Sequence, residues 1–173
     1  MWSRLKRVLK HRWLDDSAAR RGISSELVES LMQRVKASEG RHSGEVRIVV
    51  ESALPSSHLW RSPSTHQLAR QRALTLFGKL RVWDTEHNNG VLIYLLLAEH
   101  LIEIVADRGL NQHVPAHHWH SVIQHMRPPL QQGAYEEGLT LALQEASAVL
   151  LRHFPLAEGM SHQNQLPDRP LMD

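Results

Sequence analysis

Two short polar segments contain the residue types that bind hard cations. Residues 84–90 read Asp-Thr-Glu-His-Asn-Asn-Gly, and residues 107–109 read Asp-Arg-Gly. Carboxylate and amide oxygens are the ligands that Ca²⁺ and Mg²⁺ prefer. An arginine beside them could hold a phosphate through paired hydrogen bonds. The candidate oxygen ligands are therefore Asp84, Glu86, Asn88, Asn89 and Asp107, and Arg108 is the candidate phosphate-binding residue.

Each of these residues alone also fits a purely structural role. Asp84 could cap a turn, Asn89-Gly90 is ordinary turn chemistry, and residues 107–109 could be a loop with a surface ion pair. An EF-hand is excluded, because the glycine comes one place late and Leu95 occupies the position of the bidentate glutamate. The evidence for a cation site is therefore the grouping of these residues, rather than any one of them.

A hairpin is expected to bring the two segments together. Residues 91–97 form a short, continuous apolar run bounded by turn residues, which is typical of a strand buried on both faces. A tight connection at 98–100 leads into residues 101–106, the expected antiparallel partner. The start of the first strand and the end of the second then share one sheet edge, together with residues 42–45 that precede an earlier strand.

The remaining elements predict the fold class. A helix over 24–39 is capped by Ser24 or Ser25 and stopped by Gly40, and a β-branched strand follows over 45–51. The next helix begins with Ser62 as cap and Pro63 as first residue. Later helices cover 115–127, ended by Pro128-Pro129, and 132–154. The strand–helix–strand unit predicts a right-handed crossover and a parallel strand pair. We expect a three-layer α/β/α sandwich around a small mixed sheet.

The chain is expected to comprise an arm over 1–22, a folded domain over 23–155 and an extended polar tail over 156–173. The arm has an apolar stripe and five positive charges before its first acid, Asp15. It could bind a protein partner or an anionic membrane surface through residues 1–14, or pack on its own domain, which we favour. The longest apolar run, 91–98, is far shorter than the ~20 residues of a membrane span, so we expect a cytoplasmic protein without a transmembrane segment.

Composition restricts the metal chemistry further. The 173 residues include 13 histidines and no cysteine, which excludes thiolate zinc sites, iron–sulfur clusters and disulfides. His117 and His120 form an i, i+3 pair on the third helix, but no acid occurs nearby to complete a site, so we expect only adventitious metal capture there. The net charge of +2 and the absence of base-reading motifs argue against a nucleic-acid partner.

A second candidate ligand-binding site lies at the opposite edge of the sheet. Open α/β sheets usually bind ligands at the carboxyl ends of their parallel strands. Glu51-Ser52 and Ala98-Glu99-His100 are expected at that edge.

The segments 43–47, 80–86, 88–94, 105–109 and 164–168 resemble the TPM-domain family. The chain is most similar to a soluble bacterial branch that lacks a signal peptide and a membrane helix. This resemblance implies an α/β/α sandwich and a divalent-cation site, with Asp84, Asn89 and Asp107 as the main ligands and Glu86 and Asn88 as additional candidates. It also implies weak acid phosphatase activity in some members.

Two functional hypotheses follow. The first is a non-catalytic binding or interaction module that holds Ca²⁺ or Mg²⁺. The alternative is a weak metal-assisted acid phosphatase, in which the cation polarises a phosphoryl oxygen and Arg108 neutralises charge. We favour the first, because no residue stands out as a nucleophile or a positioned general base.

Overall fold

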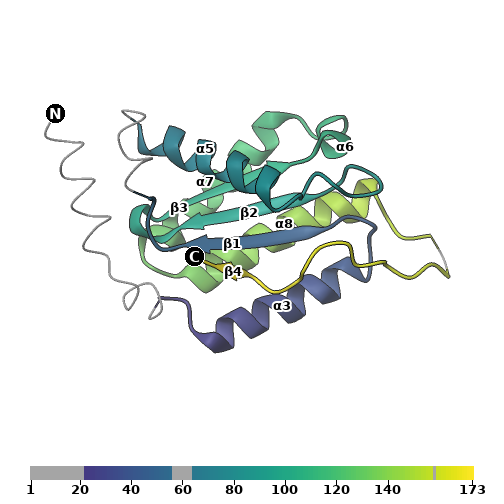
Figure 1. The fold of residues 1–173 in the computed structure, drawn as a ribbon, viewed down its shortest axis with the longest axis horizontal. Coiled ribbons are helices and arrows are strands. Elements are labelled where there is room, and N and C mark those ends of the chain that lie inside the picture. Colours follow the sequence, from purple (N-terminus) through teal and green to yellow (C-terminus); the bar gives the residue numbers. More distant parts are fainter. Residues whose placement is uncertain (1–21, 56–63, 158) are drawn as a thin grey trace, which may run out of the picture.

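The computed structural model describes residues 22–55, 64–157 and 159–173 and contains a four-stranded mixed sheet with helices on both sides (Figure 1). The strand order is β3-β2-β1-β4. The bounds are Val46–Glu51 for β1, Val91–Leu96 for β2, Leu101–Ala106 for β3 and Leu171–Met172 for β4. β1 runs parallel to β2 and β4, and β2 runs antiparallel to β3. The predicted parallel pair and hairpin are confirmed, and β4 is an addition.

Helices cover both faces of the sheet. α3 (Ser25–Glu39), α7 (Ala116–Gln131) and α8 (Tyr135–His153) pack on one face, and α5 (Thr65–Lys79) packs on the other (Figure 1). Short helical turns, η1 (Leu97–Glu99) and α6 (Arg108–Asn111), flank β3. The three-layer α/β/α sandwich is thereby confirmed. No helix in the described part of the chain is long and apolar enough to cross a membrane.

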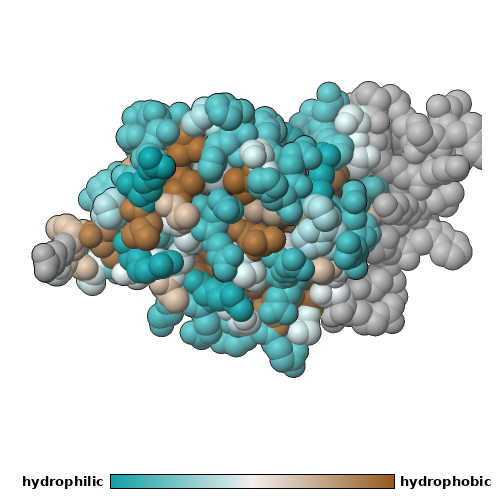
Figure 2. Space-filling view, turned by 180° about the vertical axis from the view of Figure 1, so that it is seen from behind, coloured by the Kyte–Doolittle hydropathy of each residue, from teal (hydrophilic) through white to brown (hydrophobic). Residues whose placement is uncertain are grey.

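Alternate side chains of the central strand enter two separate cores. In β2, Ile93 belongs to the cluster shared with α3, α7 and α8, whereas Leu92 and Tyr94 belong to the cluster shared with α5. All six β2 residues are buried. This two-sided burial is the reason for the continuous apolar run, since neither face of the strand meets water. The outer surface on the side away from Figure 1 is mainly hydrophilic, with separate hydrophobic patches (Figure 2).

Helix starts agree with the capping signals to different degrees. α3 begins as predicted, with the Ser24 Oγ accepting a hydrogen bond from the Leu27 N–H at 3.2 Å and Gly40 at its end. α5 begins at Thr65 with Ser64 at the N-cap, later than expected. The predicted cap, Ser62, and Pro63 lie outside the described residues.

The prediction that Pro128-Pro129 ends the third helix is wrong. α7 continues through both prolines to Gln131. Proline cannot donate to the carbonyls four residues earlier, those of Gln124 and His125. Both of these residues are exposed, so water can satisfy the carbonyls, and the extra turn fully buries Leu130.

The C-terminal segment returns to the sheet after α8. It runs back along β1 and ends as β4, with Val49 opposite Leu171 and Val50 opposite Met172 (Figure 1). Two guanidinium contacts from Arg47 to the carbonyls of Pro167 and Arg169 hold it there. The predicted arm over 1–22, including the partner-binding segment 1–14, lies outside the described residues apart from Gly22.

Candidate functional site

Two backbone hydrogen bonds join the loops 84–90 and 107–109. The Asp107 N–H donates to the Gly90 carbonyl at 2.9 Å, and the Gly109 N–H donates to the Asn88 carbonyl at 2.9 Å. Asn89 lies between these two acceptors, directly opposite the Asp-Arg-Gly turn. The hairpin thus brings the two loops together at one sheet edge, as its antiparallel register requires.

Gly109 permits this close approach. A Cβ added there would lie 2.5 Å from the Asn88 carbonyl oxygen and 2.6 Å from that of His87. Contacts this short do not occur between real Cβ atoms and backbone oxygens, so any side chain would push the loops apart. Glycine at this position is therefore a requirement of the junction.

Asn89 is completely buried, and one of its polar atoms lacks a partner. Its backbone N–H donates to Thr85 Oγ1 at 3.0 Å, and its Nδ2 donates to Ser43 Oγ at 3.2 Å. The Oδ1 atom has no hydrogen-bond partner among the described residues. A buried amide oxygen without a partner is costly, by about 1–3 kcal/mol.

Asp107 also has a buried oxygen without a hydrogen-bond partner among the described residues. Its Oδ1 caps α6 by accepting from the Arg108 N–H at 2.7 Å, whereas Oδ2 is buried and has no hydrogen-bond partner in the described part of the chain. Burial raises the pKa of the Asp107 carboxyl, and the Arg108 N–H and positive charge oppose that rise. A carboxylate oxygen and an amide oxygen on joined loops are thus both left without a donor.

The other predicted ligands are placed differently. Asp84 is exposed and pairs with Arg81, with Oδ2 2.6 Å from the guanidinium. Glu86 is also exposed, and its backbone N–H donates to Gln165 Oε1. Asn88 Oδ1 accepts from Arg108 Nε at 2.9 Å, so this asparagine orients the exposed arginine.

His117 and His120 are exposed on α7 and line different pockets. His117 faces a pocket that also contains His113 and His153, whereas His120 faces one with Glu103. Among the described residues, neither belongs to a group of three or more histidine and acidic side chains spaced to hold a metal.

The opposite sheet edge is occupied by a buried ion pair. The guanidinium of Arg72 contacts both carboxylate oxygens of Glu51, and the Tyr94 hydroxyl donates to Glu51 Oε2 at 2.6 Å. His100 Nδ1 lies 3.0 Å from the Leu130 carbonyl oxygen. Both oxygens of the Glu51 carboxylate already accept hydrogen bonds, so Glu51 is not available to bind a ligand at this second candidate site.

One group of metal-binding residue types was missed by the sequence analysis. Glu39 at the end of α3, Glu45 just before β1 and His162 of the C-terminal segment have ligand atoms within 4.8 Å of one another. The two glutamates are buried and the histidine is 11% exposed. No spacing signal could have found this group, because His162 is joined to it only by the path of the C-terminal segment.

A pocket of about 560 Å³ adjoins both groups of residues. Ser43, whose hydroxyl accepts from Asn89 Nδ2, lines it together with Glu86 and His87 from the first loop. His162 and Gln165 line it from the C-terminal segment. The pocket therefore lies between the first loop and the C-terminal segment, and neither Asn89 nor Asp107 lines it.

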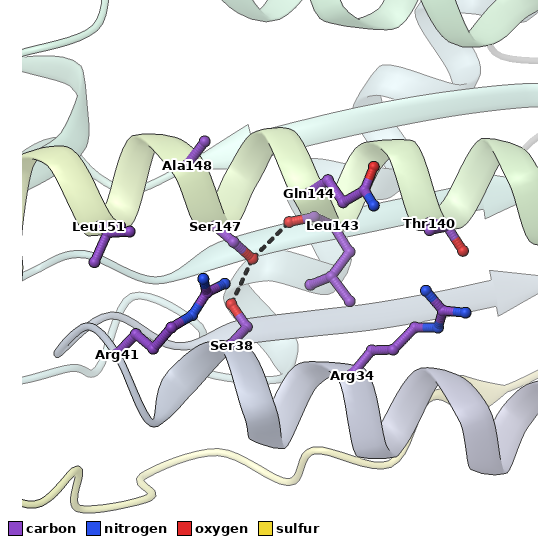
Figure 3. Close-up of a pocket in the computed structure, with 9 residues that line it drawn as sticks. All are labelled: Arg34, Ser38, Arg41, Thr140, Leu143, Gln144, Ser147, Ala148 and Leu151. Carbon is purple, nitrogen blue, oxygen red and sulfur yellow. Dashed lines mark hydrogen bonds between the residues drawn. The ribbon is translucent and has the colours of Figure 1, made fainter.

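A separate pocket of about 290 Å³ lies between α3 and α8 (Figure 3). Ser38 from α3 and Ser147 from α8 hydrogen-bond to each other at its base, and Arg34 and Arg41 extend along the α3 side (Figure 3). Ser38 Oγ also lies 2.8 Å from Nε2 of His42. This serine–histidine contact is not arranged for catalysis, because His42 is completely buried and its Nδ1 faces the Gly44 carbonyl rather than a carboxylate.

Comparison with known proteins gives one family and two similar structures. A sequence model of the TPM domain matches residues 19–149. The NMR structure of the BA42 protein from the psychrophilic bacterium Bizionia argentinensis has a TM-score of 0.71 and 23% identity, covering 87% of this chain and 95% of that one. The N-terminal domain of a P. gingivalis protein has a TM-score of 0.59 and 25% identity, covering 79% and 84%. No curated protein matches the chain.

Proposed function

The chain belongs to the TPM-domain family, and from that premise we propose that it is a non-catalytic binding module with a divalent-cation site between the loops 84–90 and 107–109. The observation that carries this proposal is the pair of buried oxygens, Asn89 Oδ1 and Asp107 Oδ2, that have no hydrogen-bond partner among the described residues. A cation accepts oxygen lone pairs that no N–H or O–H reaches, and it neutralises the buried carboxylate.

The number of ligands favours Mg²⁺ over Ca²⁺. Mg²⁺ keeps several of its waters and is commonly held by one or two carboxylates, whereas Ca²⁺ takes about 6–8 oxygens. Asn89 and Asp107 would supply two protein oxygens, with water completing the shell. Asp84 is paired with Arg81, so we assign it a smaller contribution than Asp107.

Metal titration of the full chain followed by NMR tests this proposal. Mg²⁺ should shift the amide signals of 88–90 and 107–109 together in the wild type. Asp107→Asn should weaken binding at least ~10-fold, the lower end of the effect seen on perturbing metal sites. Asparagine is as good an N-cap as aspartate, so α6 should remain intact. The matched control, Asp84→Asn, should bind nearly as the wild type does, and wild-type affinity in Asp107→Asn would refute the site.

The alternative is a weak metal-assisted acid phosphatase, and one observation favours it. Arg108 directly follows Asp107 in the chain and is exposed, and its Nε donates to Asn88 Oδ1, so its guanidinium could contact a phosphoryl group beside a bound cation. Hydrolysis of an aryl phosphate with and without Mg²⁺ decides between the two. A binding module should show no Mg²⁺-dependent hydrolysis, whereas Mg²⁺-dependent hydrolysis that is lost in Arg108→Gln would establish the phosphatase.

A further inference from the structure

The Glu39–Glu45–His162 group has the spacing of metal ligands around one ion. His162 Nε2 lies 3.0 Å from Glu45 Oε1 and 3.9 Å from Glu39 Oε2. With zinc bonds near 2.1 Å, neighbouring ligand atoms of a tetrahedral site are about 3.4 Å apart. The two distances bracket that value, so an ion could enter with only small movements of the side chains.

One nitrogen of His162 is available as a metal ligand. Nε2 of His162 is buried and makes no hydrogen bond with any described residue, although it is close to Glu45. The two atoms are near enough for an ion pair but are not aligned as a hydrogen bond. A buried imidazole nitrogen that lies near two carboxyl groups without a hydrogen bond is available to bind a metal ion.

The surrounding hydrogen bonds hold the carboxylates as a metal site would require. The Val46 N–H donates to Glu39 Oε1 at 2.8 Å, which leaves Oε2 on the side nearer His162. The Gln165 and Leu166 N–H groups donate to the two oxygens of Glu45 at 2.9 and 3.1 Å. Ligating carboxylates are characteristically fixed by such outer bonds.

No lysine or arginine forms an ion pair with Glu39 or Glu45 in the described part of the chain. The nearby cation, Arg47, directs its guanidinium to the carbonyls of Pro167 and Arg169. Among the described residues, Glu39 and Glu45 are therefore partnered by backbone N–H groups and by the His162 imidazole.

We propose that Glu39, Glu45 and His162 form a zinc-class site that clips the C-terminal segment to the end of α3 and the start of β1. One imidazole and two carboxylates are a donor set for a borderline cation such as Zn²⁺, and three protein ligands leave one position for water. This site uses different residues and a different class of metal from the Mg²⁺ site proposed above, so either can exist without the other.

Zinc titration of the metal-free full chain by calorimetry tests the proposal. The wild type should bind one Zn²⁺, and both Glu39→Gln and His162→Gln should lower its affinity at least ~10-fold. Zn²⁺ should raise the thermal midpoint of the wild type and not that of the two variants. Co²⁺ in place of Zn²⁺ should give the visible absorption of a tetrahedral ion in the wild type alone.

Two further variants make the result unambiguous. The double variant His117→Ala/His120→Ala removes the surface pair and should keep the wild-type zinc affinity. If only that double variant loses zinc, or if Glu39→Gln and His162→Gln bind as the wild type does, the proposal is overturned. Glu39→Gln retains an oxygen for the Val46 N–H, so it should fold even if His162→Gln does not. Asp107→Asn should leave zinc binding unchanged, which separates this site from the proposed function.

Discussion

Nε2 of His162 lies 3.0 Å from Oε1 of Glu45, which joins the C-terminal segment to the residue that precedes β1. The same carboxylate accepts hydrogen bonds from the Gln165 and Leu166 N–H groups. One buried side chain therefore organises the return of the segment to the sheet. Changes near Glu45 should thus affect both metal binding and the stability of the fold.

Glu39→Gln should make the metal-free protein more stable at alkaline pH. Burial, with Glu45 and Asp168 nearby, raises the pKa of Glu39 from 4.5 to about 9. A carboxyl with a raised folded-state pKa stabilises fully below pH 4.5 and loses that contribution as the pH rises toward 9. The wild type should lose up to about 1.4 kcal/mol per pH unit in this window, and glutamine removes that dependence.

Urea unfolding in EDTA at pH 6.5 and 8.5 measures this difference. This range avoids His42, whose pKa is lowered to about 4 by burial and which is therefore neutral throughout. Glu45 and His162 face Glu39 and remain in both proteins, so only the difference between the two slopes is diagnostic. Parallel stability profiles for wild type and variant would contradict the prediction.

Gly109→Ala should separate the two loops and abolish Mg²⁺ binding. The added methyl would meet the carbonyl oxygens of Asn88 and His87, so the Gly109–Asn88 hydrogen bond must break. We expect a loss of about 1–3 kcal/mol in the free energy of unfolding, as for overpacking elsewhere. Gly78→Ala is the control, because nothing lies within 4 Å of a Cβ added there, in the exposed part of α5. Equal Mg²⁺ affinity in the two variants would count against the loop junction as the site.

Ser38→Ala should destabilise the protein more than Ser147→Ala. Neutral His42 uses its Nδ1 hydrogen toward the Gly44 carbonyl, and Ser147 donates to the Leu143 carbonyl. Ser38 has one hydrogen for two contacts, His42 Nε2 and Ser147 Oγ, so the network is one proton short. Removing Ser147 relieves that shortage, whereas removing Ser38 leaves the buried His42 Nε2 without a donor, at a cost of about 1–3 kcal/mol.

Urea unfolding of both alanine variants at pH 7 tests this order. Each substitution removes one buried hydroxyl, so the difference between the two losses isolates the hydrogen-bond effect. Equal losses, or a larger loss for Ser147→Ala, would show that His42 is held in another protonation state.

Arg72→Met should cost more stability than Tyr94→Phe. Arg72 is the partner of the buried Glu51 carboxylate, and removing one member of a buried ion pair costs about 3–5 kcal/mol. Tyr94→Phe removes a single hydrogen bond to that carboxylate, about 1.5–3 kcal/mol. Denaturant unfolding at pH 7 compares them, and a smaller loss for Arg72→Met would mean that Tyr94 is the principal partner of Glu51.

The fold was predictable because its signals are local. The apolar run at 91–97, the Ser24 and Gly40 signals of α3 and the strand–helix–strand order each act over a few residues, and together they give the α/β/α sandwich. The end of α7 was mispredicted because burial of Leu130 outweighs the loss of two hydrogen bonds at exposed carbonyls. β4 was not predicted, because two residues carry no periodic pattern and pair only through contact with β1.

The candidate cation site was predictable only in part. Antiparallel pairing places the residues before one strand opposite those after the other, so the meeting of 88–90 with 107–109 follows from the hairpin. The hairpin does not determine which oxygens are left without a hydrogen-bond partner. Asp84 pairs with Arg81 and Asn88 with Arg108, whereas one oxygen each of Asn89 and Asp107 is buried without a partner.

The sequence by itself determined the layers of the fold, the hairpin and the confinement of metal chemistry to oxygen and imidazole donors, since all of these depend on local pattern or composition. The tertiary structure alone decided that His162, the histidine beside the buried glutamates, is a C-terminal residue rather than one on α7. The physical reason is that such a site depends on long-range docking of one segment on another, and docking is set by packing and hydrogen bonds that leave no spacing pattern in the chain.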